Sequence, residues 1–219
     1  GPAKEKWLQS LDQGKSLSQE EISEVQKLVG WDKIHIENGE FFKDVDGVKI
    51  DLGGIAKGYG VDLLYERLSS QNTKPVFVQW SGEIRASQAH PHSRPWKVQI
   101  LSPKGSVFAK EQLDIINLEN QSIATSGDYL QTWPVTDELG NIEIYTHIVD
   151  PKTCCVLKHS KNQVTSFTVL ADSCAFADAL ATAGMMFSSA GELKDWTNGI
   201  KLNYPKISFW GFSKQESLL

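Results

Sequence analysis

Short apolar runs separated by turn-forming residue pairs constrain the fold of this chain more than any other feature of its sequence. Ile34 and Ile36 alternate with polar residues up to Asn38-Gly39, a pair typical of tight hairpin turns. Asp46-Gly47 repeats this signal before the run Val48–Ile50, so we predict a meander of short strands that ends at the next glycines. Further strands are predicted over 76–78, 83–85, 96–100, 112–118, 143–149, 164–170 and 207–212.

Four other stretches show helical spacing. Ser18 followed by Glu21 has the pattern of a capping box, and apolar residues then recur every three or four positions until Gly30. The remaining helices are predicted over 55–70, 173–187 and 190–198, with a short helical turn over 128–131. The sequence therefore predicts an α+β protein with mixed, largely antiparallel sheets and packed helices.

The length of 219 residues suits a single domain with its own hydrophobic core. We expect that core to span about residues 18–212. Gly1-Pro2 is typical of what a protease leaves behind when it removes an expression tag. Residues 1–17 are therefore expected to be a tag remnant and leader.

Composition argues against several classes of protein. There are 22 Lys and Arg against 27 Asp and Glu, and the resulting charge of −5 disfavours binding to the phosphate backbone of nucleic acids. The most apolar stretch, 173–191, is interrupted by Asp178 and is rich in small and hydroxyl side chains, which favours a core helix over a membrane span. Three cysteines make no disulfide framework, and the amino terminus reads as neither signal peptide nor lipobox, so we expect an intracellular protein.

A glycine-rich stretch, Asp51-Leu-Gly-Gly-Ile-Ala-Lys-Gly58, joins the predicted meander to the helix that follows it. Glycines let a backbone approach a phosphate closely, the free N–H groups of a helix N-terminus attract anions, and Lys57 adds positive charge. The spacing differs from both the Rossmann and the Walker patterns. Taken alone, the stretch fits a tight structural turn at least as well as a phosphate site.

Three more side chains are candidates for chemistry. Asp178 and Thr182 are four residues apart on a predicted helix, so they share a face and could hold a hard cation through oxygen ligands. Tight packing of a small-residue helix is the alternative. His147 lies in an alternating strand, where histidine serves either as a general base or as a hydrogen-bonded structural residue.

Taken together, these stretches resemble the ApbE family of FAD:protein FMN transferases. The motifs follow one another in the family's order: DLGGIAKGYGVD at 51–62, SGEIR at 81–85, ATSGDY at 124–129, HIVDPKT at 147–153 and ADALATA at 177–183. The resemblance extends over about residues 20–212.

The resemblance implies an ApbE-like flavin transferase fold and a metal-dependent enzyme. Such an enzyme moves FMN from FAD to a Ser or Thr hydroxyl of a target flavoprotein, or of a fused flavoprotein domain, forming a phosphoester and releasing AMP. The residue roles that the resemblance implies are FAD contacts for Asp51 and Lys57, Mg²⁺ binding by the main-chain carbonyl of Gly54 and the side chains of Asp178 and Thr182, and a general base at His147.

Two departures from the family pattern keep alternatives open. Cys154 and Cys155 stand in the segment where family members usually have a Gly and a Pro, so we expect an altered turn that carries two thiols. Family members also carry a further N-terminal segment with flavin contacts, which this sequence lacks. An FAD pyrophosphatase giving FMN and AMP, and a non-catalytic flavin-binding module of a larger flavoprotein, therefore remain alternatives.

Overall fold

The computed structural model describes residues 1–71, 74–88, 90–102, 112–128, 131–137, 139–213 and 218–219. These residues form two compact units: unit 1 comprises Gly1–Asp51 and Asp128–His159, and unit 2 comprises Leu52–Gly127 and Ser160–Leu219. The single-domain interpretation stays a prediction. The α+β class is confirmed, since helices accompany antiparallel sheets in both units. Within the described residues, every helix is too short or too polar to cross a membrane.

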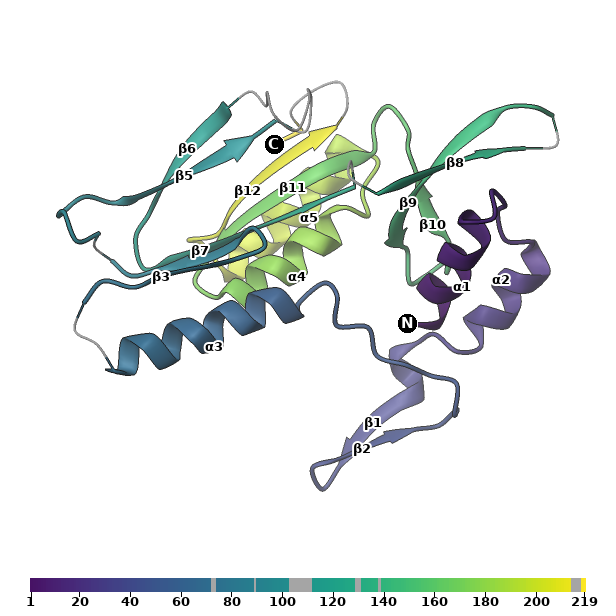
Figure 1. Ribbon diagram of the computed structural model, residues 1–219, viewed down its shortest axis with the longest axis horizontal. Helices are drawn as coiled ribbons and strands as arrows, with labels where there is room; N and C mark the ends of the chain where they lie inside the picture. Colours follow the sequence, from purple (N-terminus) through teal and green to yellow (C-terminus); the bar gives the residue numbers. More distant parts are fainter. Residues whose placement is uncertain (72–73, 89, 103–111, 129–130, 138, 214–217) are drawn as a thin grey trace. The chain divides into compact units, whose positions relative to one another are not determined.

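Unit 1 combines short helices with two small antiparallel sheets (Figure 1). Its elements are α1 (Pro2–Leu11), α2 (Gln19–Gln26), the 3₁₀ turn η1 (Trp31–Lys33), β1 (Ile34–Glu37), β2 (Glu40–Lys43), β8 (Thr132–Thr136), β9 (Ile142–Val149) and β10 (Val156–Lys158). Strand β1 pairs with β2, and β9 lies between β8 and β10.

The expectation that residues 1–17 are a tag remnant and leader stays a prediction, but within this segment Pro2–Leu11 form a helix that packs into a core. Helix α1 places Ala3, Trp7 and Leu11 on one face, and all three are buried in a core cluster of unit 1. Trp7 is only 3% exposed and packs against Tyr145, with ring centroids 5.7 Å apart and ring planes tilted by 30°. Its indole N–H donates to the carbonyl of Cys154 over 2.7 Å. The helix is thus part of the core because its apolar face covers β9.

The predicted hairpin forms, but the strand predicted after it does not. Asn38 and Gly39 adopt positive φ angles of 52° and 81°, as a tight turn between β1 and β2 requires. Val48–Ile50 and the residues that lead into the glycines are irregular. A strand needs a neighbour that takes up its backbone N–H and C=O groups, and none of the described strands pairs with this run.

Unit 2 is a five-stranded antiparallel sheet in the order β12-β11-β7-β4-β3, with a separate hairpin and three helices (Figure 1). Its elements are α3 (Ala56–Gln71), β3 (Phe77–Trp80), β4 (Glu83–Ala86), β5 (Trp96–Leu101), β6 (Gln112–Leu118), β7 (Gln121–Gly127), β11 (Val164–Ala171), α4 (Cys174–Gly184), α5 (Ala190–Asn203) and β12 (Ser208–Ser213).

Strand β11, which lies between β12 and β7, shows how unit 2 is layered. All eight of its residues are buried, because helices cover one face of the sheet and the β5–β6 hairpin covers the other. Phe167 faces the helices, where a side chain on Gly184 of α4 would overlap its ring. Leu170 faces the hairpin and packs with Ile100 and Leu118.

Most predicted elements are confirmed within one or two residues. The capping box at Ser18 is present in full, with hydrogen bonds in both directions to Glu21. Helix α4 ends at Gly184, earlier than predicted, whereas α5 continues to Asn203. Strands β7, β8 and β10 were not predicted. The helical turn predicted over 128–131 includes residues 129–130, which lie outside the described residues.

Cys154 has a backbone conformation that normally favours glycine. Its φ angle is 57°, in the left-handed region that glycine enters without strain. Its thiol is buried in the core of unit 1, whereas that of Cys155 is half-buried, and neither forms a disulfide bond. The backbone here therefore bends as a glycine would, and the cysteine side chain fills the core.

Candidate functional site

Helices α3 and α4 of unit 2 are joined by two buried carboxylates, each of which binds the N-terminus of the other helix. Asp62 of α3 accepts hydrogen bonds from the backbone N–H groups of Cys174 (3.0 Å) and Ala175 (2.9 Å) at the start of α4. Asp178 of α4 accepts one from the N–H of Gly58 in the first turn of α3, over 3.0 Å. These N–H groups have no partner within their own helix, so the carboxylates satisfy them and favour the helix dipoles.

Asp62 also fixes the surroundings of this junction. The Arg85 guanidinium of β4 donates to Asp62 over 2.7 Å and lies over the ring of Tyr65, 4.4 Å from its centroid. The hydroxyl of Ser173, the residue that caps α4, donates to the other oxygen of Asp62 over 2.8 Å. The position of α4, and of the side chains it carries, is therefore set by α3 and β4.

Gly58 is required where the two helices cross. A side chain there would overlap the carbonyl oxygen of Cys174, and its Cβ would lie 2.8 Å from the Cβ of Asp178. Any residue other than glycine forces the helices apart. The glycine-rich stretch is thus a close-packing device, in agreement with the structural alternative, and it also brings Lys57 to Asp178.

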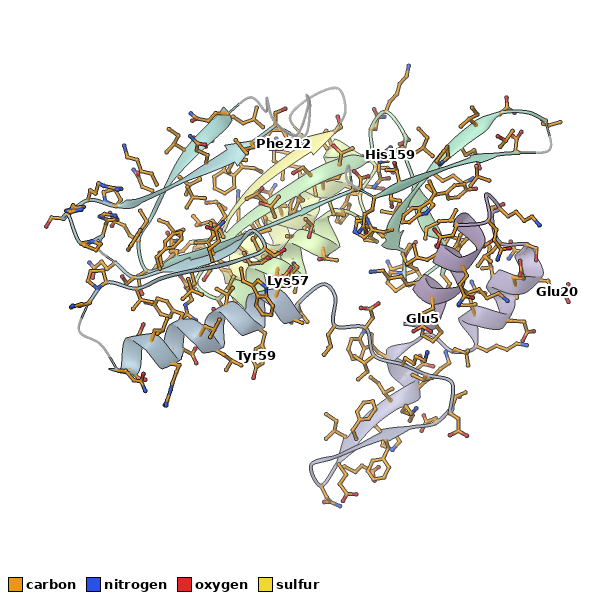
Figure 2. The ribbon with its side chains drawn as sticks, viewed as in Figure 1. Glu5, Glu20, Lys57, Tyr59, His159 and Phe212 are labelled. Atoms are coloured by element: carbon orange, nitrogen blue, oxygen red, sulfur yellow. The ribbon has the colours of Figure 1, made fainter. Side chains whose placement is uncertain are left out.

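Lys57 lies between two buried carboxylates. Its ammonium forms a hydrogen-bonded ion pair with Glu83 of β4 and lies 3.5 Å from Oδ1 of Asp178. Both carboxylates are only 2% exposed, whereas the lysine side chain is 39% exposed. Figure 2 shows Lys57 at the end of α3 that lies beside α4, with Tyr59 pointing away from that helix.

The pKa of Lys57 reflects this arrangement. Burial by itself lowers the pKa, but the hydrogen bond to Glu83 and the charge of Asp178 outweigh burial and raise it. Burial is also the largest influence on Glu83, whose pKa it raises against the opposing effect of Lys57. Two carboxylates therefore share one ammonium, and the second oxygen of Glu83, Oε2, is buried and makes no hydrogen bond.

Thr182 lies one helical turn beyond Asp178. Its hydroxyl is 3.2 Å from that of Ser126 on β7. The backbone of Gly54 lies directly against it, since a Cβ on that glycine would be 3.0 Å from Oγ1 of Thr182. Of the three predicted metal ligands, the structure thus brings Gly54 and Thr182 together and places Asp178 on the same helix as Thr182.

These residues fit a hard divalent cation. A carboxylate, a hydroxyl and a backbone carbonyl are the oxygen ligands that Mg²⁺ prefers. The surrounding charge is unbalanced, because one ammonium faces two buried carboxylates and one carboxylate oxygen has no partner. Among the described residues, no three His, Cys, Asp or Glu side chains form a metal-binding group by themselves, so the set depends on Thr182 and Gly54 as well.

The other two predicted site residues belong to unit 1. Asp51 is 43% exposed and its Oδ2 lies 2.9 Å from the amino group of Gly1. His147 lies on β9 and is half-buried, and its buried Nδ1 makes no hydrogen bond. Burial, with a contribution from the charge of Lys4, lowers the pKa of His147 below its ordinary value against the opposing effect of a backbone hydrogen bond at Gln131, and this favours the neutral imidazole.

Two residues that the sequence did not mark as functional stand out. Glu83 lies within a motif that carried the family resemblance, but a single acidic residue beside a turn gave no sign of its pairing with Lys57. The side chain of His159 in unit 1 is only 8% exposed, and its Nε2 lies 3.0 Å from Oδ2 of Asp128; Figure 2 labels this histidine. Both pairings join residues that are distant in sequence, so local patterns do not reveal them.

Comparison with known proteins identifies the family. A sequence model of the ApbE family matches residues 1–201, including the first 17 residues. The FAD:protein FMN transferase of Chlamydia muridarum is 36% identical over 198 residues, which are 90% of this chain and 58% of that protein. A Vibrio cholerae protein of the same name is 36% identical over 167 residues, covering 76% of this chain and 47% of the relative.

Solved structures agree with this assignment. The flavinyl transferase ApbE of Pseudomonas stutzeri, in its apo form, superimposes with a TM-score of 0.72 and 26% identity over 92% of this chain and 57% of its own. The ApbE protein of Thermotoga maritima gives a TM-score of 0.72 and 30% identity over 91% and 60%. The chain spans 47–60% of the length of these four proteins. Since the family model covers nearly the whole chain and the fold agrees, the chain belongs to the ApbE family.

Proposed function

We propose that this chain carries out metal-dependent transfer of FMN from FAD to a Ser or Thr hydroxyl of a target flavoprotein, with formation of a phosphoester and release of AMP. The relatives named FAD:protein FMN transferase support flavin transfer. The observation that carries the proposal is the α3–α4 junction, where Lys57, Asp178, Thr182 and Gly54 gather in one place with an excess of buried negative charge.

The proposed reaction breaks the pyrophosphate of FAD. The hydroxyl oxygen of the acceptor forms a new bond to the phosphorus of the FMN half, the bond from that phosphorus to the bridging oxygen breaks, and AMP leaves with the bridging oxygen. Mg²⁺, held by Asp178, Thr182 and the carbonyl of Gly54, would neutralise charge on the phosphoryl oxygens. Lys57 contributes a second positive charge to the same oxygens, and because its ammonium is already oriented by Glu83 it needs little rearrangement.

His147 is the proposed general base. An alcohol has a pKa far above neutrality, so its attack is aided by a base that is unprotonated at pH 7 and has a free nitrogen. Two observations support this role: burial lowers the pKa of His147, and its Nδ1 has no hydrogen-bond partner. In this proposal His147 takes the hydroxyl proton as the new phosphoester bond forms. Asp51 is proposed to contact FAD.

The test is to incubate the protein with FAD, Mg²⁺ and a flavoprotein acceptor domain, and to follow AMP, FMN and the acceptor mass by chromatography and mass spectrometry. We expect AMP to appear together with an acceptor that has gained FMN. Free FMN with AMP and an unmodified acceptor would replace the proposal with FAD pyrophosphatase activity. Intact FAD in the presence of folded protein and Mg²⁺ would refute catalysis by this chain.

Matched variants make the assignment of residues testable. Asp178→Ala is expected to lower AMP release by at least about a hundredfold, because both a cation ligand and a cap of α3 are lost. Asp195→Ala is the control, since Asp195 is an exposed aspartate on α5. Equal activity of the two variants would contradict the proposed role of Asp178.

A further inference from the structure

Glu83 is the residue of the α3–α4 junction to which the proposed reaction gives no part beyond orienting Lys57. It begins β4, its side chain is 2% exposed, and its Oε1 forms an ion pair with the Lys57 ammonium. Its Oε2 is buried and has no hydrogen-bond partner. Keeping an ionised carboxylate in such a place is costly, so a polar residue here calls for an explanation.

The explanation comes from Lys57, because Glu83 and Asp178 both attract its ammonium. The ammonium bonds closely to Glu83 but is 3.5 Å from Oδ1 of Asp178, the long limit of a hydrogen bond. Asp178 has its other oxygen, Oδ2, engaged with the N–H of Gly58. Oδ1 is therefore the oxygen that Asp178 offers to a cation, and the ammonium of Lys57 is the internal cation that competes for it.

We propose that Glu83 is a positioning residue that holds the Lys57 ammonium away from Asp178 and so keeps Oδ1 of Asp178 available to a divalent cation. This inference rests on the proposed function, in which Asp178 is a metal ligand. Without the carboxylate of Glu83, Lys57 has Asp178 as its nearest acidic partner. A metal ion then has to displace an ammonium from the same oxygen before it binds.

The test measures cation binding without FAD, so that it does not depend on turnover. Mn²⁺ is titrated into the folded protein and free Mn²⁺ is followed by electron paramagnetic resonance, with Mg²⁺ as competitor. Glu83→Gln keeps the shape of the side chain but removes its charge. We expect it to weaken Mn²⁺ binding by about tenfold or more, the scale on which one buried charge interaction acts. Glu66→Gln, at an exposed carboxylate of α3, is the control and is expected to leave binding unchanged within about twofold.

A double-mutant cycle with Lys57→Met separates positioning from direct coordination. Lys57→Met by itself is expected to bind Mn²⁺ at least as tightly as the wild type, because the internal competitor is gone. In that background Glu83→Gln should have little further effect, since no ammonium remains to be held. If Glu83→Gln weakens binding equally in both backgrounds, Glu83 acts on the metal directly and the proposal is overturned.

Two further outcomes are decisive. If Glu83→Gln does not fold, Glu83→Asp is the second variant, because it keeps the charge on a shorter side chain. We expect Glu83→Asp to bind Mn²⁺ more weakly than the wild type does, but more tightly than a protein without this charge. An affinity equal to that of the wild type would then argue against positioning by Glu83. If the wild type binds no Mn²⁺, the metal-dependent function itself fails. If the wild type binds and Glu83→Gln binds equally well, only the role of Glu83 fails.

Discussion

Replacing Gly58 by alanine tests the central claim that α3 and α4 approach so closely that only glycine fits. In the interior of a helix this change normally stabilises a protein by about 1 kcal/mol, because alanine restricts the unfolded chain more than glycine does. At Gly58 the new Cβ would overlap the Cys174 carbonyl and lie 2.8 Å from the Cβ of Asp178. Ordinary contact begins at 3.4 Å, so the helices must separate by several tenths of an ångström or more.

That separation has two costs. Forcing an extra methyl group into a packed interior costs about 1–3 kcal/mol. Lengthening the bond from the Gly58 N–H to Asp178, which is 3.0 Å, removes part of a charge-assisted hydrogen bond worth about 1.5–3 kcal/mol. After the gain in helix propensity, we expect Gly58→Ala to lower the free energy of unfolding by about 1–4 kcal/mol.

The control for this variant lies in the same unit. Gly199 is in the middle of α5, and a Cβ placed there meets no atom within 4 Å. Gly199→Ala should therefore raise the free energy of unfolding by up to about 1 kcal/mol. Urea denaturation followed by far-UV circular dichroism gives both values. If Gly58→Ala is as stable as the wild type, or gains stability as Gly199→Ala does, the reasoning about close approach is refuted.

Three further predictions concern unit 1 and the thiols. Trp7→Ala should lower the free energy of unfolding, measured by urea denaturation, by about 3–5 kcal/mol, because it empties a buried site and leaves the Cys154 carbonyl without its donor. A decrease of less than about 1 kcal/mol would mean that α1 does not belong to the core. His147 has a lowered pKa when folded, so the unfolded chain binds its proton more readily: its contribution to stability is complete above pH 6.5 and is lost as the pH falls below that value. An NMR titration of the imidazole should give a midpoint below 6.5, and a midpoint at or above 6.5 would exclude it as a base tuned by burial. A chromogenic thiol reagent should modify Cys155 in the native protein but not Cys154 or Cys174, because these two residues are only 2% and 0% exposed. Burial also raises the pKa of the Cys174 thiol, which lowers its reactivity further. Modification of all three cysteines before unfolding would contradict this burial.

Local signals in the sequence were sufficient wherever the deciding interactions lie within a few residues. The capping box at Ser18 and the turn at Asn38-Gly39 are closed by neighbours in the chain, and both formed as predicted. The runs that became β4, β9 and β11 were found from their residue pattern, although β11 pairs with strands that are distant in the sequence. The local sequence pattern wrongly predicted a strand at Val48–Ile50, because a strand also needs a partner strand and the sequence does not show whether one is near.

The same distinction applies to the candidate site: the sequence supplied the residues, and the structure showed which of them are in contact. The sequence, through its family resemblance, supplied Asp51, Gly54, Lys57, His147, Asp178 and Thr182 as candidates. It did not show that Gly58 is a contact between helices, or that Lys57 is shared by Asp178 and Glu83. Gly58 and Asp178 are 120 positions apart, and their hydrogen bond exists only because α3 and α4 pack together.

The sequence by itself determined the class of the fold, most of the helices and strands, and the residue types available for chemistry, because these depend on periodicity and on short-range hydrogen bonds. The tertiary structure alone decided that α1 belongs to a core, that Glu83 faces Lys57, and that two buried carboxylates share one ammonium. Burial and charge balance are properties of everything that surrounds a side chain, and most of those surroundings come from distant parts of the chain.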